Sequence, residues 1–296
     1  MNIETYLEEK RIHIDHWLDQ HLPPENLSPS SIHRAMRYSL LARSKRIRPI
    51  LSLAVAELLQ GNIEWVFPFA CALELIHTYS LIHDDLPAMD NDDFRRGQPS
   101  NHKVFGEGVA ILAGDALLTH AFSLMSSPQT VASIPSHIAL PAIYEVSQAA
   151  GTQGMIGGQI MDLESEGHTV TLSHVETMHA WKTGAMVSAA IRVGALISGA
   201  SDAHMENLSR YGRHIGLAFQ IVDDLLDVEG HPELLGKTVG KDFSARKATF
   251  PSVLGIEESK NYTRYQYEQA IQALEEFGDQ AEILRSLAHF IVFRRS

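Results

Sequence analysis

Apolar residues recur at helical spacing along most of this 296-residue chain. Near its start, Ile3, Leu7, Ile14 and Leu18 follow the interval of a helix that a Pro-Pro pair would end. The same interval predicts further helices from Ser30, from Pro49 to Gly61, and over 67–86, 110–125, 138–150, 157–163, 175–197, 205–228 and 265–293. Strand patterns are nearly absent, no repeat or linker is present, and loops are expected at 126–136, 164–172 and 229–250. The pattern therefore predicts one all-α domain over residues 1–296.

The overall composition narrows the possible classes of function. Apolar residues make up 45% of the chain, and the net charge of −12 includes no basic stripe, which argues against a nucleic-acid partner. Cys71, the single cysteine, lies in an apolar run, so an intrachain disulfide is excluded and a reducing cytoplasm is expected. The polar, acidic N-terminus does not resemble a secretory signal, and no window of about 18 uncharged apolar residues suits a membrane span. We therefore expect a cytoplasmic protein with no membrane span.

A dense acidic cluster begins at Asp84. Five aspartates fall within ten residues, Asp85 and Asp90 among them, and Arg95 and Arg96 follow at once. Such a run repels itself unless cations bridge it, and Mg²⁺, which usually completes its shell with substrate phosphates, is a natural partner. Two adjacent arginines suit bidentate phosphate recognition. The alternative is a solvated acidic loop with a basic cap.

A second acidic cluster lies far along the chain. Asp223, Asp224 and Asp227 follow Gln220 in an apolar segment, and on a helix Gln220, Asp223 and Asp227 would share one face. Both acidic clusters lie on, or directly follow, segments predicted to be apolar helices. The sequence therefore predicts one site built from two facing helices, with these carboxylates as candidate metal ligands.

Two cationic groups precede the first acidic cluster. Lys45 and Arg48 lie three residues apart and could face one way on a helix, with Arg46 turned elsewhere. His77 precedes Asp84 by two helical turns on the same face. A solvated basic patch remains the alternative for the first group, and a satisfied core histidine remains the alternative for the second.

Two further motifs follow later in the chain. K-T-G at 182–184 places a cation and a hydroxyl in an apolar helix, where a break would open backbone carbonyls to a cavity. A close helix crossing is the alternative, and it is favoured for G-G-Q-I-M-D at 157–162. The loop after the second acidic cluster carries Lys237 and Lys247, which suit a phosphate-sensing lid or a plain solvated loop.

Together these motifs resemble those of the trans-prenyltransferases, the short-chain isoprenyl diphosphate synthases. The resemblance rests on D-D-x-x-x-x-D with R-R-G, K-T-G, G-G-Q-x-x-D, F-Q-x-x-D-D-x-x-D and G-x-D-x-x-x-x-K-x-T, in the family's order over roughly residues 33–251. The family fold is an all-α bundle around a deep central cavity, usually as a homodimer, and the resemblance implies both for this chain. The spacer of the first aspartate motif, with Tyr79 five residues before it, is similar to that of bacterial farnesyl diphosphate synthases.

The resemblance also implies the reaction and the groups that perform it. The reaction is Mg²⁺-dependent head-to-tail condensation of isopentenyl diphosphate with dimethylallyl and geranyl diphosphate through an allylic carbocation, and it ends at farnesyl diphosphate. About three Mg²⁺ ions would be bridged by the allylic diphosphate. They would be held directly by Asp84, Asp90 and Asp223, and through water or indirectly by Asp85, Asp224 and Asp227.

Each diphosphate would have its own set of residues. Isopentenyl diphosphate would be held by Lys45, Arg48, His77 and Arg96. The allylic diphosphate would be bound by Arg95, Lys182, Thr183, Gln220, Lys237 and Lys247. Of these, Lys182, Thr183 and Gln220 are the candidate catalytic residues, because the oxygens of Thr183 and Gln220 would face the developing cation.

Product length is predicted from the helix that leads to Asp84. Ser80 lies one turn below Asp84 and Tyr79 is its neighbour, so a ring at that depth would form the cavity floor. Geranyl and geranylgeranyl diphosphate synthases of the same family are the alternatives. Remoter alternatives are a class I terpene cyclase, an H-D metal phosphohydrolase suggested by His83-Asp84, and a non-catalytic helical scaffold.

Three places depart from the family pattern. Arg43-Ser44 stand where two glycines usually precede Lys45, and Phe250 stands where a tyrosine is usual. The chain ends in Arg294-Arg295-Ser296, a basic tail that suits either a substrate contact or the favourable charge at a helix C-terminus.

Overall fold

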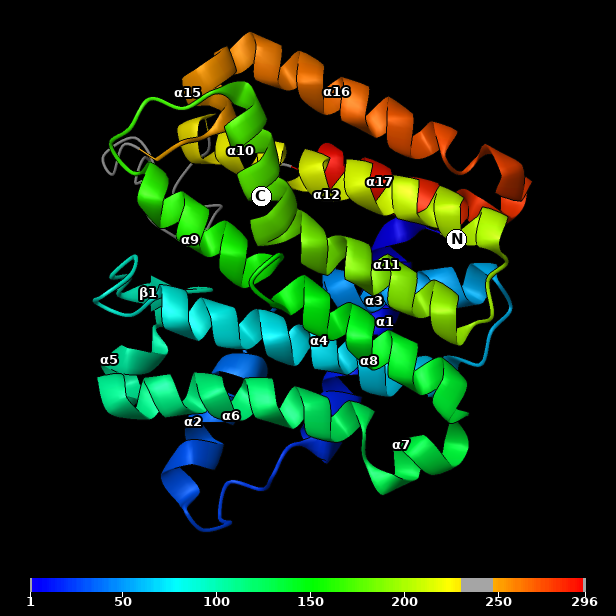
Figure 1. Cartoon of the computed structure of the whole chain (residues 1–296). Helices are drawn as coiled ribbons and strands as arrows, with labels where there is room; N and C mark the ends of the chain where they lie inside the picture. The colour runs from blue at the N-terminus through cyan, green and yellow to red at the C-terminus, as the bar shows by residue number, and fades with distance from the viewer. Residues whose placement is uncertain (1, 230–246, 295–296) are drawn as a thin grey trace.

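The computed structural model describes residues 2–229 and 247–294. These parts are almost entirely helical, and the long helices run roughly side by side (Figure 1). The helices are α1 (Ile3–His21), α2 (Ser30–Leu40), α3 (Ile47–Leu58), α4 (Ile63–Asp84), α5 (Asn101–Phe105), α6 (Glu107–Met125), α7 (Pro128–Ser133), α8 (Ser136–Ala150), α9 (Met155–Ser165), α10 (Leu172–His179), α11 (Ala185–Ile197), α12 (Asp202–Glu229), α15 (Phe250–Leu254), α16 (Ile256–Gln272) and α17 (Glu282–Val292). A two-residue hairpin, β1 (Phe94–Arg95) with β2 (Gln98–Pro99), follows the first acidic cluster.

The all-α prediction is confirmed, and three predicted boundaries are wrong. The expected loop 126–136 contains α7, which Ser127 caps by accepting a hydrogen bond from the Thr130 amide. The predicted helix 175–197 is interrupted by a π-helical turn, Ala180–Gly184. The predicted helix 265–293 instead comprises the end of α16, a 3₁₀ segment and α17, because Gly278 adopts a φ of 52° that ends regular helix geometry.

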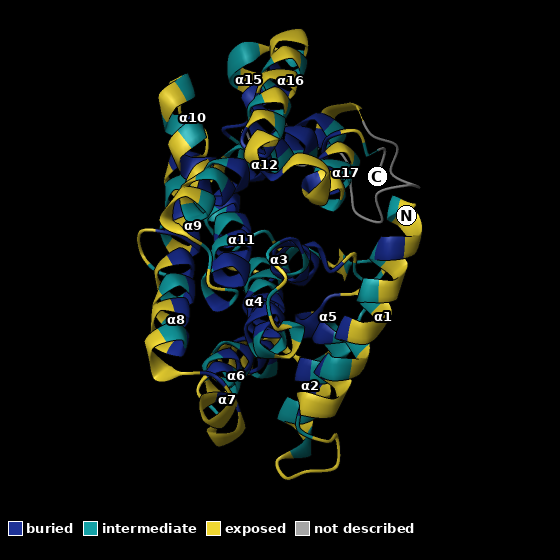
Figure 2. Ribbon diagram, turned by 90° about the vertical axis from the view of Figure 1, so that its right-hand side faces the viewer, coloured by how far each residue is buried: buried dark blue, intermediate teal, exposed yellow. Residues whose placement is uncertain are grey.

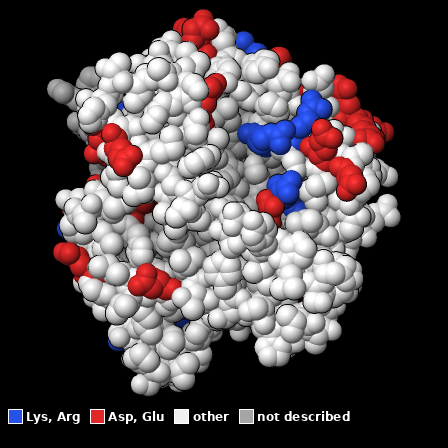
Figure 3. All heavy atoms as spheres, in the orientation of Figure 1, with Lys and Arg blue, Asp and Glu red and all other residues white. Residues whose placement is uncertain are grey.

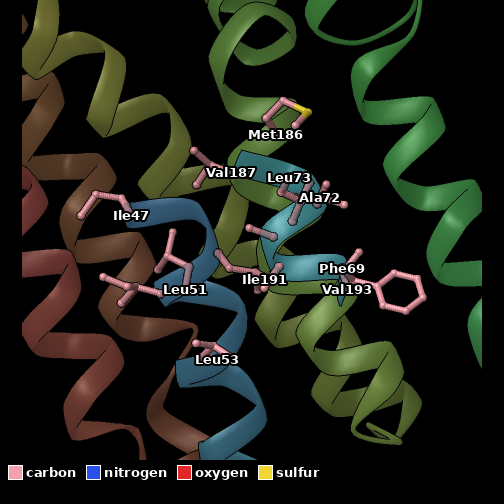
Figure 4. Close-up of a cluster of buried hydrophobic side chains, with 14 of the residues drawn as sticks. Ile47, Leu51, Leu53, Phe69, Ala72, Leu73, Met186, Val187, Ile191 and Val193 are labelled. Carbon is pink, nitrogen blue, oxygen red and sulfur yellow. The ribbon is translucent and has the colours of Figure 1, made fainter. Parts of the chain in front are cut away.

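Helices α3, α4 and α11 form the centre of the protein. Figure 2 shows them as the darkest, most buried part, with α1 and α2 on one side and α8 and α9 on the other. Side chains such as Leu51, Leu73 and Ile191 interdigitate between the three helices (Figure 4). A Cβ at Gly194 would lie 2.5 Å from the Ser52 carbonyl oxygen, so the crossing of α11 and α3 requires a glycine there. This packing holds α4, and with it the first aspartates, on a rigid scaffold.

In the part of the chain that the structure describes, two helical segments are long and apolar enough to cross a membrane by length and composition alone. They are Ile63–Asp84 and Glu107–Ser133. Within the most apolar 18-residue window of each segment, 72% of the first and 39% of the second is buried inside the protein. The sequence-based exclusion of any such segment was therefore too strict, because it allowed no charged residue in the window. The burial of α4 explains its composition as that of a core helix that is apolar on all sides.

Candidate active site

The two acidic clusters meet at one cavity. It has a volume of about 630 Å³ and is lined by Asp84 from α4, Asp223 from α12, and Lys182 and Thr183 from the π-helical turn. The rest of its wall is mainly apolar and includes residues of the loop after α4, of α6 and of α9, together with Phe219. A largely apolar cavity with a few convergent charged groups is the usual form of a small-molecule site. The predicted pairing of two acidic helices is thus present.

The loop after α4 folds back on the helix end. The Asp90 amide donates to the Asp84 carbonyl oxygen at 2.8 Å, which returns Asp90 to the side of Asp84. Burial raises the pKa of Asp84 to about 6, and the neighbouring carboxylates of Asp90 and Asp85 act in the same direction. A buried carboxylate of this kind is stabilised by an added cation.

The cations predicted to hold the allylic diphosphate are paired with carboxylates of the site. Arg95 donates from Nε and Nη2 to Asp85 Oδ1 at 2.9 and 2.5 Å. Lys182 Nζ donates to Asp162 Oδ2 at 2.5 Å. Lys247 Nζ donates to Asp90 Oδ1 at 3.0 Å, and the predicted partner Lys237 lies outside the described residues. Each of these three cations therefore has a carboxylate partner in the absence of substrate.

Asp223 has a basic partner from the end of the chain. Arg294 Nη2 donates to Asp223 Oδ1, and the Arg294 guanidinium lies over the Phe219 ring at 4.0 Å. This contact places Arg294 beside a cavity-lining aspartate, and the same residue directly follows the C-cap of α17. Arg295 lies outside the described residues.

Asp224 and Gln220 organise α12. Asp224 accepts hydrogen bonds from the Phe250 amide at 3.0 Å and from Gln220 Nε2 at 2.8 Å. The Gln220 oxygen accepts the Thr183 hydroxyl hydrogen at 2.7 Å, which ties α12 to the π-helical turn. Asp224 and Asp227 are buried and do not line the cavity, which fits a supporting role. Thr183 lines the cavity, whereas Gln220 is not one of the lining residues and contacts Thr183 instead.

Phe250, the second departure from the family pattern, is fully buried. Its ring stacks on that of His179 at 5.4 Å, and burial lowers the pKa of His179 to about 4. Since the backbone amide rather than the ring holds Asp224, a phenylalanine fills this place without a hydroxyl.

The basic residues predicted to hold the second diphosphate gather beside the cavity. Arg48 and His77 line it, and burial lowers the pKa of Arg48 and of Arg96. Burial, with Arg48 and Arg96 nearby, holds the pKa of His77 well below its ordinary value, so the ring is neutral. Burial likewise lowers the pKa of Lys45, and its ammonium lies 5.8 Å from the Phe290 ring centroid. Cations held this way favour an incoming anion.

The residue that organises this basic group was missed by the sequence analysis. Glu74 is fully buried in α4; it accepts hydrogen bonds from Arg46 Nη1 at 2.8 Å and from the Ser44 hydroxyl at 3.1 Å, and Arg96 lies 3.9 Å away. Burial alone would raise the pKa of Glu74, but Arg46 and Arg96 outweigh burial and lower it. Arg46 also binds Asp15 at 2.8 Å. The sequence signal was a glutamate in the middle of an apolar run of α4, and Ser44 gains a structural role from it.

The glycines of G-G-Q-I-M-D provide close packing, as expected. A Cβ at Gly158 would lie 2.1 Å from the backbone nitrogen of Lys182, so α9 rests directly on the π-helical turn. The acidic end of this motif, Asp162, is the partner of Lys182. Burial alone would raise the pKa of Asp162, but the Lys182 ammonium outweighs burial and lowers it.

Tyr79 and Ser80, the predicted chain-length residues, both line the cavity. The Tyr79 ring meets the His83 ring edge-on with 5.7 Å between centroids. The Tyr79 hydroxyl is buried and has no hydrogen-bond partner among the described residues. Ser80 donates its hydroxyl to the His77 carbonyl oxygen at 2.9 Å.

The carboxylates fit a divalent cation that arrives with substrate. Among residues 2–229 and 247–294, no group of three or more His, Cys, Asp or Glu side chains forms a ready cation cage. Mg²⁺ is commonly held by one or two carboxylates together with substrate phosphates, and Asp84 and Asp223 at one cavity supply carboxylates of that kind.

Known proteins share this sequence and this fold. The polyprenyl synthetase family model matches residues 29–289. The chain is 47% identical to a geranylgeranyl diphosphate synthase of Cyanophora paradoxa, over 100% of this chain and 97% of that protein. It is 46% identical to a farnesyl diphosphate synthase of Geobacillus stearothermophilus, over 91% and 90%.

Solved structures agree with these relatives. A synthase of farnesyl and geranylfarnesyl diphosphate from Zymomonas mobilis superimposes with a TM-score of 0.88 at 38% identity, over 98% of this chain and 99% of that one. A Helicobacter pylori geranyltransferase, solved with magnesium and isoprenyl diphosphate, gives 0.85 at 33% identity, over 99% and 97%. The chain therefore belongs to the polyprenyl synthetase family and is a trans-prenyltransferase.

Proposed function

We propose that this prenyltransferase condenses isopentenyl diphosphate with dimethylallyl and then geranyl diphosphate, and releases farnesyl diphosphate. The observation that carries the product length is the Tyr79 ring, which lines the cavity one turn below the aspartates. Relatives of similar identity are named for either fifteen-carbon or twenty-carbon products, so family membership alone leaves this length open.

The cations of the site, together with the neutral His77, divide between the two substrates. Arg95, Lys182 and Lys247 exchange their carboxylate partners for the allylic diphosphate and stabilise the negative charge that develops as it leaves. Lys45, Arg48, His77 and Arg96, which border the Glu74 network, hold isopentenyl diphosphate. Mg²⁺, when bound with substrate at Asp84, Asp90 and Asp223, neutralises further charge on the leaving group.

The cavity wall protects the allylic cation. Its apolar side chains exclude water, which would otherwise capture the cation. Thr183, held by Gln220 on the π-helical turn, presents oxygen to the cation. After the alkene attacks, a proton must leave. The family resemblance implies that the released pyrophosphate accepts this proton.

Product analysis of Tyr79 variants tests the proposed length. The enzyme is incubated with Mg²⁺, isopentenyl diphosphate and dimethylallyl diphosphate, and the dephosphorylated products are separated by chromatography. Tyr79→Ala should give products of twenty carbons or more, and Ser80→Phe should shift products toward geraniol. Tyr79→Phe is the matched control, because the hydroxyl has no partner among the described residues and the ring alone should set the length.

Two results would contradict the proposal. An active Tyr79→Ala enzyme that still stops at farnesol places the floor elsewhere. A native enzyme that yields mainly geranylgeraniol establishes the twenty-carbon alternative.

We also propose that the enzyme is a homodimer. Ile111 and Leu112 on α6 and Leu140 and Tyr144 on α8 are between 45% and 65% exposed. Figure 3 shows few charged side chains over the part of this face formed by α6 and α8. A large face with few charges and with exposed aliphatic and aromatic side chains suits a second copy of the chain. Sedimentation of the native protein and of a Leu140→Glu variant tests this proposal, because a monomeric native protein would contradict it.

A further inference from the structure

The His83 ring lies against a bare stretch of α6. A Cβ at Gly114 would lie 2.1 Å from His83 Nε2, 2.5 Å from Cδ2 and 2.9 Å from Cε1. The ring also donates from Nε2 to the Ile111 carbonyl oxygen at 2.9 Å, one turn earlier on α6. The histidine is thus both seated on a glycine and hydrogen-bonded to the backbone of the same helix.

The backbone conformation at position 114 does not require a glycine. It lies in the interior of α6, where glycine is less stable than alanine by roughly 0.5–1 kcal/mol, and its φ is not positive. The neighbouring His83 ring supplies the reason, because ordinary contact begins at 3.4 Å and any side chain at 114 would intrude on it.

His83 in turn contacts the ring of Tyr79. The two residues are four apart on α4, and their rings meet edge-on at 5.7 Å with an interplanar angle of 78°. Tyr79, His83 and Ile111 all line the cavity. The position of the Tyr79 ring therefore depends on where His83 rests, and the position of His83 depends on Gly114.

We propose that the His83–Gly114 contact is a second determinant of product chain length. His83 positions the Tyr79 ring, and the missing side chain at 114 sets how far back His83 lies against α6. A side chain at 114 pushes the histidine toward the cavity and shortens the space for the growing chain. Loss of the histidine removes the support behind Tyr79 and lengthens that space. This inference rests on the proposed prenyl diphosphate synthesis, whichever length the native product has.

Four variants test it in the full-length enzyme: Gly114→Ala, His83→Ala, the double variant, and Gly108→Ala. Gly108 is the matched control, because it lies on α6 and a Cβ there meets nothing within 4 Å. The measured quantity is the ratio of product lengths, which a general loss of activity does not alter. Gly114→Ala should shift the ratio toward shorter products by about ten-fold or more, the smallest usual effect of a methylene-sized misfit in an apolar pocket. His83→Ala should shift it toward longer products, and Gly108→Ala should leave it unchanged.

The double variant shows whether Gly114→Ala acts through its contact with His83 or whether the two substitutions act independently. Without the histidine ring the added methyl group meets no clash, so the double variant should give the products of His83→Ala alone. This expectation decides the matter even if Gly114→Ala alone fails to fold.

Native product ratios in His83→Ala would overturn the inference, and so would a double variant that keeps the short products of Gly114→Ala. A native enzyme that makes no prenyl diphosphate would instead refute the proposed function, so the two failures are distinct.

Discussion

The contact between Gly158 of α9 and the π-helical turn provides a direct test of how the site is held. In Gly158→Ala the added Cβ would lie 2.1 Å from the backbone nitrogen, 2.5 Å from Cα and 2.8 Å from Cβ of Lys182. These are mostly backbone atoms, so no flexible side chain can rotate away. Because Lys182 and Thr183 both line the cavity, the substitution acts on the site from outside it.

The size of the effect follows from the geometry. Ordinary contact begins at 3.4 Å, so the turn or α9 must retreat by about 1.3 Å, which is 3.4 minus 2.1 Å. A misplacement of about 1 Å can lower turnover roughly 100-fold, or about 2.7 kcal/mol of barrier. Overpacking of this kind also lowers the free energy of unfolding by about 1–3 kcal/mol. We therefore expect a folded but slow enzyme.

The assay is single-turnover condensation with radiolabelled isopentenyl diphosphate, together with thermal unfolding. Gly184→Ala is the control, because it adds the same methyl group to the π-helical turn itself, where the nearest atom lies at an ordinary 3.5 Å. The control should turn over close to the native rate. A folded Gly158→Ala enzyme with native kcat would show that the position of Lys182 and Thr183 is not fixed by this crossing.

Three further predictions concern the charges. EDTA should abolish turnover and Mg²⁺ restore it, while Asp84→Ala or Asp223→Ala should raise the barrier by about 3–6 kcal/mol; near-normal turnover in either variant removes the metal assignment. Arg96→Ala should mainly raise KM for isopentenyl diphosphate and Arg95→Ala should mainly impair the allylic substrate, so equal effects on both substrates contradict the division of roles. The pKa of Glu74 is lowered from 4.5 in the folded state, so its stabilisation is present above pH 4.5 and is lost as pH falls through the folded value. Glu74→Gln should remove this loss of unfolding free energy at acid pH and should lower the unfolding free energy at pH 7 by about 3–5 kcal/mol. If denaturant titrations show the same loss at acid pH in the variant, the role of Glu74 is contradicted.

The helices were predictable from the sequence because their apolar faces recur at regular intervals. The boundary errors occurred where one residue overrides that interval. Gly278 breaks a predicted helix through its left-handed φ, and Ser127 starts α7 inside a predicted loop by capping it. The π-helical turn has no periodic signature, although K-T-G marked the place where the helix changes.

The acidic half of the site was predictable for a similar reason. Asp223 and Asp227 lie one turn apart on an apolar helix. Carboxylates that lie on apolar helices are not on a free polar surface, and this indicated that the two acidic clusters share a site. The Glu74 network was not predictable, because its partner Arg46 is 28 residues away in the sequence. The helical spacing had also turned Arg46 away from the face of Lys45 and Arg48. The seating of His83 on Gly114 depends on the register of α4 against α6, which no local pattern encodes.

On the proposed division of roles, the internal pairing of the allylic-side cations makes substrate capture an ion-exchange process. Arg95, Lys182 and Lys247 would release Asp85, Asp162 and Asp90 when a diphosphate takes their place. A bare diphosphate would leave the buried carboxylates of Asp85 and Asp162 without their cationic partners, which is strongly unfavourable. A diphosphate that carries its own divalent cations offers each displaced carboxylate a replacement. The proposed roles therefore imply an enzyme that selects substrates by their counter-ions before it selects them by the length of the prenyl chain.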